Sequence, residues 1–160
     1  YRRYGNTLHE IVPDLYLSYA TDSGYDAPLL DAEETLEERS EISLSLENRL
    51  MDGRGIFFTL RVVQPYSLRL HEQAWRPLQG DLYFNGEYLH IKLETSYDHY
   101  LHGIATANGD ASISMGMFRA GVGQRYDRKN DVLFYTGRAG VNITPHLSLD
   151  SSIWYDEEAV

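Results

Sequence analysis

Apolar and polar residues alternate along most of the chain. Between positions 89 and 98, one phase holds Leu89, Ile91, Leu93, Thr95 and Tyr97, and the other holds His90, Lys92, Glu94, Ser96 and Asp98. A period of two gives a β-strand with one apolar and one polar face. Segments 8–20 and 40–51 show the same pattern. Each run is about 10 residues long, whereas strands of soluble proteins usually have about 5–6 residues and tilted membrane-crossing strands about 9–11.

The pattern predicts nine strands, which are 8–20, 40–51, 56–65, 77–85, 89–98, 104–115, 118–126, 132–143 and 147–156. Short turns alternate with longer loops along the chain, the longer ones being 21–39, 66–76, 99–103 and 127–131. Outer-membrane barrels have this asymmetry, with short periplasmic turns and longer extracellular loops. We therefore predict an all-β fold, an antiparallel up-and-down transmembrane β-barrel segment formed by residues 1–160 as a single incomplete barrel domain.

Tyrosines recur where predicted strands meet the longer loops. Tyr97-Asp98, Tyr126-Asp127 and Tyr155-Asp156 follow one another at intervals of 29 residues, from 97 to 126 and from 126 to 155. A fixed interval indicates a repeated supersecondary unit, here a hairpin. With Tyr19 and Tyr66, these tyrosines are predicted to form part of an aromatic girdle at the outer membrane interface. The alternative is that tyrosine is simply favoured in strands.

Composition excludes several classes of protein. The chain has 160 residues, no cysteine and a formal net charge of −10. The negative charge argues against binding to nucleic acid phosphates. No apolar stretch of 18 residues occurs, which argues against a helical membrane protein. The mean hydropathy of −0.42 would suit a soluble protein, but the polar lumen of a barrel also lowers this average.

Charged residues of the strands fall on the polar phase. They are Arg49, Arg61, Arg119, Arg125 and Arg138, with Asp81, Lys92, Glu94, Asp110 and Asp150. In a barrel they would face the lumen, since an Arg on the lipid face near the bilayer midplane costs about 2–4 kcal/mol. A soluble sheet with one wet face would show the same pattern. Pro13 lies inside a strand, where proline is confined to edges or bulges, and for a barrel we expect a bulge that breaks the ladder.

The residues at both ends suggest a longer natural chain. No signal peptide precedes Tyr1, although an outer-membrane protein must be exported. Nine strands is an odd number, and the acidic end at 156–160 adds no further strand. We therefore expect the natural protein to extend beyond both ends.

Several stretches together point to a known family. They are His9-Glu10-Ile11-Val12-Pro13, Tyr19, Leu29-Leu30-Asp31, Ser43-Leu44-Ser45-Leu46-Glu47-Asn48-Arg49-Leu50, Arg76-Pro77-Leu78 and Ile143-Thr144-Pro145-His146-Leu147-Ser148-Leu149. This pattern resembles the middle part of the C-terminal barrel of the LPS-assembly outer-membrane protein LptD, the organic solvent tolerance protein family.

The resemblance implies a role in lipopolysaccharide transport in the cell outer membrane of Gram-negative bacteria. Proteins of this family receive lipopolysaccharide from a periplasmic bridge protein through a jelly-roll domain. Their large barrel surrounds a lipoprotein plug, LptE, and releases lipopolysaccharide through a seam between its first and last strands, without breaking a bond. The expected partners are thus lipopolysaccharide, a plug of the LptE type, the bridge protein and outer-membrane lipid. The jelly roll and seam would lie outside this chain, and the family's disulfide cysteines are absent from it.

Candidate chemistry is limited to two loops. His99 and His102, with Asp98, could form a metal site or join a Ser such as Ser96 or Ser114 in a hydrolytic triad, but the spacing is not specific and ordinary loop histidines are the simpler interpretation. The loop residues Asp31, Glu33, Glu34, Glu37 and Glu38 could hold divalent cations that bridge lipopolysaccharide phosphates, or form a solvated loop. We predict no catalytic, cofactor-binding or metal site, and no enzymatic activity.

Three other functions stay open on the sequence. They are a general porin or small stand-alone barrel, an outer-membrane lipid-modifying enzyme, and a soluble carbohydrate-facing β-sheet protein. The unfinished C-terminal end, the lack of a distinctive nucleophile and the long strands with tyrosines at one rim argue against them in turn.

Overall fold

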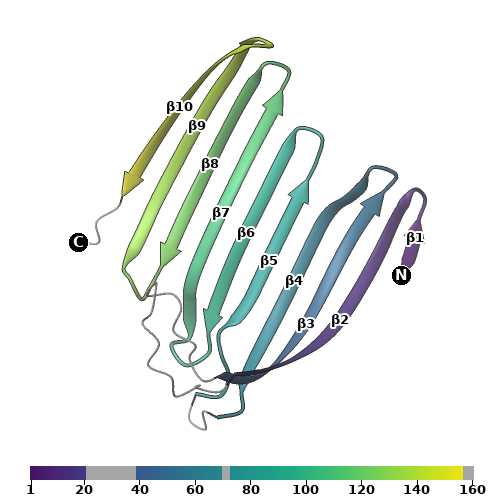
Figure 1. Ribbon diagram of the computed structural model, residues 1–160, viewed down its shortest axis with the longest axis vertical. Coiled ribbons are helices and arrows are strands. Elements are labelled where there is room, and N and C mark those ends of the chain that lie inside the picture. The colour runs from purple at the N-terminus through teal and green to yellow at the C-terminus, as the bar shows by residue number, and fades with distance from the viewer. Residues whose placement is uncertain (21–38, 70–72, 157–160) are drawn as a thin grey trace.

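The computed structural model describes residues 1–20, 39–69 and 73–156, which form one antiparallel sheet of ten strands. Strand order follows chain order from β1 to β10, so every strand pairs with its sequence neighbours (Figure 1). The strands are β1 (Arg2–Tyr4), β2 (Thr7–Ala20), β3 (Arg39–Asp52), β4 (Gly55–Ser67), β5 (Leu78–Asn85), β6 (Leu89–Asp98), β7 (Gly103–Met115), β8 (Phe118–Asp127), β9 (Val132–Thr144) and β10 (Leu147–Asp156). No helix in the described residues is long and apolar enough to cross a membrane.

All nine predicted strands are present, each with ends within two residues of the prediction. The tenth, β1, was not predicted because three residues are too few to show an alternating pattern. It pairs with β2 from Arg2↔His9 to Tyr4↔Thr7, through a turn in which Gly5 adopts a φ of 60°. Glycine takes this left-handed conformation without steric cost.

The registers sort the side chains onto two faces. Cross-strand partners point to the same side of a sheet, and Leu60 pairs with Leu82, which pairs with Leu93. We call this side the apolar face, and its members from other strands include Leu15, Leu44, Val122 and Ile153. The opposite side, the polar face, carries Glu47, Arg61, Asp81, Glu94, Asp110, Arg125, Arg138 and Asp150.

Charge is confined to the polar face. Asp52 and Asp98 follow bulges at the ends of β3 and β6. Of the other Asp, Glu, Lys and Arg residues of β2 to β10 whose side chains the structure describes, all lie on the polar face by register. The predicted phase of the strand arginines is therefore confirmed.

The described residues cover neither face of the sheet with a second layer. On the apolar face, Leu17 and Ile153 each expose 71% of their surface and Leu15 exposes 68%. No large side chain of the described residues is fully buried, and the buried hydrophobic residues Val63 and Ala74 lie near the loop end of β4. The described residues form no buried core on the sheet, so an apolar environment for the apolar face has to come from outside them.

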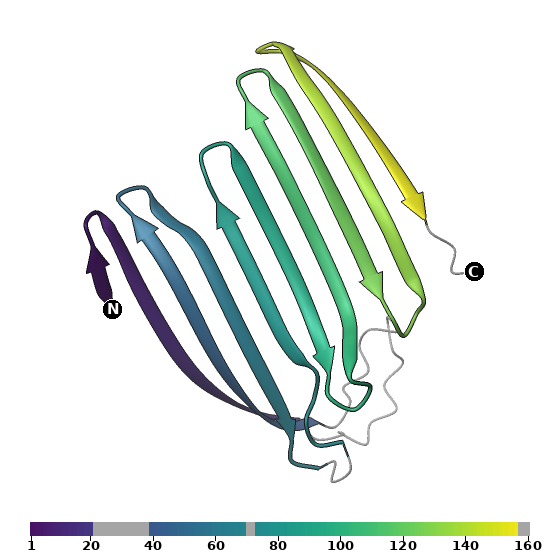
Figure 2. The same cartoon turned by 180° about the vertical axis from the view of Figure 1, so that it is seen from behind.

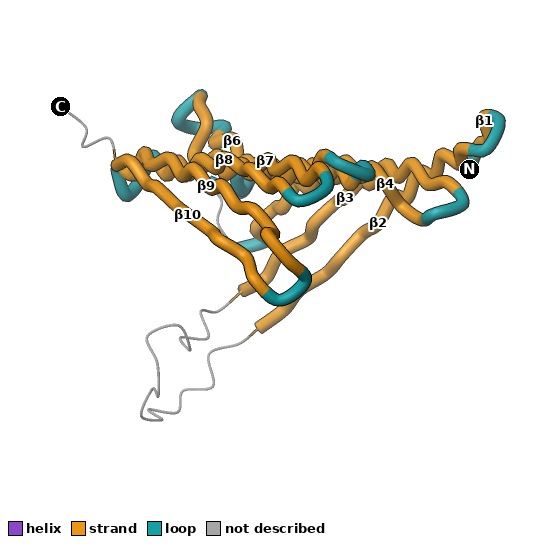
Figure 3. The backbone as a smooth tube through the Cα atoms, turned by 90° about the horizontal axis from the view of Figure 1, so that it is seen from above, coloured by secondary structure: helices purple, strands orange, loops and turns teal. Residues whose placement is uncertain are grey.

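The sheet is open. Seen from behind and from above, β1 and β10 lie at opposite sides of the molecule (Figures 2 and 3). The all-β, up-and-down antiparallel architecture is thus confirmed for a sheet that does not close on itself.

The predicted bulge at Pro13 is wrong. Pairing of β2 with β3 continues without a register shift from Leu8↔Met51 to Ala20↔Arg39, with Pro13 opposite Leu46. Since β1 covers β2 only as far as His9, Pro13 lies where β2 has a partner on one side alone. An edge position tolerates the missing N–H, which removes the need for a bulge.

Candidate functional site

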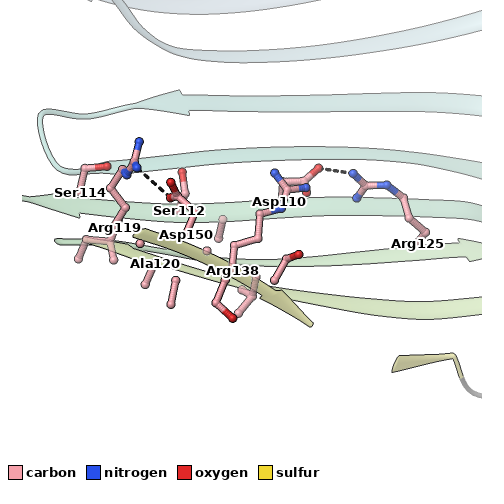
Figure 4. Close-up of a pocket in the computed structure, with 16 residues that line it drawn as sticks. Asp110, Ser112, Ser114, Arg119, Ala120, Arg125, Arg138 and Asp150 are labelled. Atoms are coloured by element: carbon pink, nitrogen blue, oxygen red, sulfur yellow. Dashed lines mark hydrogen bonds and ion pairs between the residues drawn. The ribbon is translucent and has the colours of Figure 1, made fainter. Parts of the chain in front are cut away.

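The polar face is hollowed into a groove of about 580 Å³ over β7, β8, β9 and β10 (Figure 4). Its charged lining consists of Arg119, Arg125 and Arg138 with Asp110 and Asp150. Serines from the outer strands of the groove, among them Ser112 and Ser152, add hydroxyls. The groove therefore has three cations and two anions within one hollow.

Two of the three arginines pair with the two carboxylates. Arg125 Nη2 lies 2.6 Å from Asp110 Oδ2, and Arg125 Nη1 donates to the carbonyl oxygen of Gly109 at 3.0 Å. Arg119 Nη2 lies 2.8 Å from Asp150 Oδ1. Both pairs are partly exposed, so each contributes only about 0–1 kcal/mol to stability.

Glycines make room for these pairs. Arg119 of β8 and Asp150 of β10 pair across β9, over Gly140. Gly140 lies opposite both residues in the register. A Cβ at Gly140 would collide with the carboxylate of Asp150. A Cβ at Gly123 would lie 2.7 Å from Asp110 Oδ1. The groove therefore depends on residues without side chains at these two positions of the polar face.

Paired charges continue along the polar face outside the groove. On β6, Lys92 Nζ lies 2.8 Å from Glu94 Oε1, which also accepts a hydrogen bond from the Tyr83 hydroxyl at 3.0 Å. On β3, Arg49 Nε lies 2.6 Å from Glu47 Oε1, and Arg49 Nη1 lies 3.5 Å from Glu10 Oε2 on β2. The polar face is thus a surface of mixed charge, suited to contact with water and with polar solutes.

The aspartates and the tyrosines of the Tyr-Asp repeats have separate structural roles, and the aspartates stabilise loops. Two of the three aspartates, Asp98 and Asp127, cap the loop that follows them. Asp98 Oδ1 accepts the backbone N–H groups of Tyr100 at 2.8 Å and Leu101 at 2.9 Å. These hydrogen bonds, that of Leu101 first, lower the pKa of Asp98. Each loop then ends with a residue of positive φ, which is 47° at His102 and 53° at Asp131.

The next repeat uses the same geometry. Asp127 Oδ1 accepts the N–H groups of Lys129 at 2.9 Å and Asn130 at 3.2 Å, and its Oδ2 accepts from the Asn130 side-chain amide at 2.7 Å. The amide of Asn130 is the main cause that lowers the pKa of Asp127. The sequence period of 29 residues therefore corresponds to two hairpins with the same aspartate-capped loop.

The tyrosines of the repeat lie on the apolar face at the loop end of the sheet. By register this holds for all five predicted members, Tyr19, Tyr66, Tyr97, Tyr126 and Tyr155. Tyr135, which pairs with Tyr155, was not in the predicted set and joins them. The common face and rim are the geometry that an aromatic girdle requires.

Gln64 is a polar residue on the apolar face at the loop end of the sheet, and its hydrogen bonds explain this position. Gln64 donates to the carbonyl oxygen of Arg76 at 2.8 Å, and its Oε1 lies 2.8 Å from His99 Nε2. Trp75 packs edge-on against Tyr66, with ring centroids 5.1 Å apart. Gln64 thus joins the loop after β4 to the loop after β6, a role that its phase in the strand did not predict.

The histidine, aspartate and serine residues that were considered for a metal or hydrolytic site do not converge. Asp98 accepts hydrogen bonds from the backbone N–H groups of Tyr100 and Leu101, while His99 contacts Gln64. Ser96 Oγ lies 2.6 Å from Thr106 Oγ1, and Ser114 lines the groove on another strand. Among the described residues, no group of three or more His, Cys, Asp or Glu could hold a metal ion. The acidic segment at 31–38 lies outside the described residues.

The opposite rim has one ion pair between neighbouring turns. Arg54 Nη1, in the turn between β3 and β4, lies 3.0 Å from Glu87 Oε2, in the turn between β5 and β6. The hydrogen bond from Arg54 lowers the pKa of Glu87, and the same bond raises the pKa of Arg54. This pair ties together two hairpins that are neighbours through the pairing of β4 with β5.

No family model matches the chain, and no curated protein matches it. Function must therefore be argued from the two faces of the sheet and from the groove.

Proposed function

We propose that the chain is part of the wall of an outer-membrane β-barrel and that this barrel translocates lipopolysaccharide to the cell surface. The observation that carries the membrane part is the separation of the two faces. The apolar face is exposed and free of described strand charges apart from the bulged strand ends, and it bears tyrosines at one rim. Lipid supplies the apolar environment that the described residues do not.

Strand length supports the same proposal. β7 has 13 residues, which at about 3.3 Å per residue and a tilt of about 40° span about 33 Å along the membrane normal, enough to cross an apolar band of about 25 Å. The short turns and longer loops then face the periplasm and the cell exterior respectively. On this basis the tyrosines lie in the outer headgroup layer.

Two arguments support lipopolysaccharide as the cargo. One is the resemblance of the strands to the LptD family. The other is the chemistry of the polar face, whose arginines and one lysine suit phosphates and whose serines and carboxylates suit sugar hydroxyls. On this proposal a lipoprotein plug of the LptE type and a periplasmic bridge protein are partners, and transport breaks no covalent bond.

A general porin is the second candidate. Mixed Arg and Asp charges along one face would also line a water-filled channel for small solutes. The two candidates differ in whether lipopolysaccharide touches the polar face. That difference can be measured directly.

Site-specific photocrosslinking in living cells tests the proposal. A photoreactive phenylalanine analogue is placed either at Lys92 on the polar face or at Met115 at the turn end of the apolar face. Lipopolysaccharide transport predicts an adduct at Lys92 that an antibody to lipopolysaccharide detects. It predicts none at Met115, because phospholipid surrounds the periplasmic half of the barrel.

Two further results complete this test. A porin predicts no lipopolysaccharide adduct at Lys92, and that result would refute transport. The protein recovered from the outer-membrane fraction should bring down a small lipoprotein, and it should have an intact mass several times the 18.4 kDa of this chain. A mass near 18.4 kDa without a partner would leave a small stand-alone barrel.

A further inference from the structure

The groove on the polar face contains one arginine without a partner. Arg119 and Arg125 each form an ion pair, but Arg138 makes no hydrogen bond or ion pair to any described residue. Its side chain is exposed in the groove (Figure 4). The groove thus carries one cation more than its two carboxylates neutralise, in a chain whose formal net charge is −10.

The surroundings of Arg138 leave room for a ligand. Its cross-strand neighbour on β8 is Gly121, which has no side chain, and the next residue in that row on β7 is Ser112. On its other side lies Ser152 of β10. Both serines are exposed, and neither hydroxyl is hydrogen-bonded within the described residues. One row across four strands therefore offers a guanidinium flanked by a gap and by two free hydroxyls.

The ion pairs on either side preserve this arrangement. Asp110 pairs with Arg125 and Asp150 pairs with Arg119, and neither carboxylate forms an ion pair with Arg138. In Figure 4 Arg138 extends along the groove toward the Asp110–Arg125 pair. A guanidinium in this setting matches the oxygens of an anion, because it donates parallel N–H groups in a fixed fork.

We propose that Arg138, with the hydroxyls of Ser112 and Ser152, binds a phosphate group in this groove. The guanidinium donates to two phosphate oxygens, and the serines donate to the remaining ones. The phosphate is either free inorganic phosphate or the phosphomonoester of a lipid or sugar. The site goes beyond transport of lipopolysaccharide, since it would exist in a channel for small anions as well.

Phosphate binding to the purified, detergent-solubilised protein tests this site. Isothermal titration with inorganic phosphate at low ionic strength compares the unaltered protein with Arg138→Gln. We expect saturable binding that is about tenfold weaker in the variant, because a charge-assisted bidentate contact is lost. The matched control is Arg61→Gln, which removes the same charge from the same face but outside the groove, and it should change the affinity less than about twofold. Circular dichroism checks that each variant keeps its β-structure.

A second variant and a second probe sharpen the result. Asp150→Asn frees Arg119, so it should tighten phosphate binding. Micelles that contain lysophosphatidic acid test the lipid source, and micelles of lysophosphatidylcholine, which lacks a phosphomonoester, are their control. Binding of lysophosphatidic acid that depends on Arg138 identifies a lipid phosphate, whereas binding of inorganic phosphate alone identifies a soluble ligand. The site is refuted by an absence of saturable phosphate binding, or by an equal loss in Arg138→Gln and Arg61→Gln.

Discussion

Substitution of Leu93 by arginine tests whether lipid covers the apolar face. Leu93 on β6 pairs with Gly109, the seventh of the 13 residues of β7, so it lies at the middle of a long strand. Its side chain is 46% exposed in the sheet. If the strand crosses a bilayer, this position lies near the midplane.

The expected cost depends on depth along the strand. Leu93→Arg should lower the free energy of unfolding by about 2–4 kcal/mol, the cost of an Arg on the lipid face at the midplane. Met115, the last residue of β7, is also on the apolar face and is 56% exposed. It lies about 20 Å further along the strand, or about 15 Å in depth at a tilt of about 40°. Met115→Arg should therefore cost only about 0–1 kcal/mol.

A substitution on the other face is the matched control. Gln79 is exposed on the polar face of β5, where it pairs with Ser96. Gln79→Arg should change the stability by less than about 0.5 kcal/mol. Reversible urea titration of the protein folded into phospholipid vesicles, followed by the fluorescence of Trp75 and Trp154, measures all three variants.

Two outcomes would refute this reasoning. Equal costs at Leu93 and Met115 would mean that the environment of the apolar face does not change with depth, as expected for a soluble sheet covered by protein. A cost for Gln79→Arg as large as that for Leu93→Arg would mean that the two faces have been assigned wrongly.

Three further predictions concern the groove, the loops and the turns. Gly140→Ala should destabilise the protein by no more than about 1 kcal/mol in the same urea titration, because the new methyl group displaces the exposed carboxylate of Asp150 and breaks its pair with Arg119, whereas Gly80→Ala, whose Cβ would be 3.4 Å from its nearest neighbour, should be tolerated. Asp98→Ala should speed amide hydrogen exchange at the backbone N–H groups of Tyr100 and Leu101, which donate to this carboxylate, while Asp98→Asn should largely preserve their protection. Since the pKa of Asp98 is lowered in the folded protein, its contribution to stability is complete above the ordinary carboxyl pKa. That contribution is lost as the pH falls through the lowered value. The stability contributed by the pair of Glu87 with Arg54 is likewise lost at low pH, because the pKa of Glu87 is also lowered. Glu87→Gln should therefore make the stability less sensitive to acid. Added salt should weaken the contribution of this pair in the unaltered protein.

The sequence by itself determined the strands, their order and their two faces. The reason is that every strand pairing in an up-and-down sheet joins strands that are neighbours in the chain, so a period of two and the turn residues between runs are sufficient. The loop-end position of Tyr97 and Tyr126 followed from the same local pattern. β1 was missed because a strand of three residues carries no period.

Features that depend on the exact register were decided only by the tertiary structure. The bulges in the pairing of β3 with β4 and of β6 with β7 have no signal in the alternation, and the bulge expected at Pro13 does not exist. Gln64 departs from the apolar phase because two loops meet above it, which no single strand reveals.

The groove shows this limit most clearly. Arg119 and Asp150 pair across an intervening strand only because Gly140 lies between them. The sequence shows the two charges on the polar phase, but contact between strands that are not neighbours depends on how the sheet aligns and bends. The same alignment sets Arg138 in one row with a glycine and two serines, so its lack of a partner among the described residues could be recognised only once the four strands had been placed together.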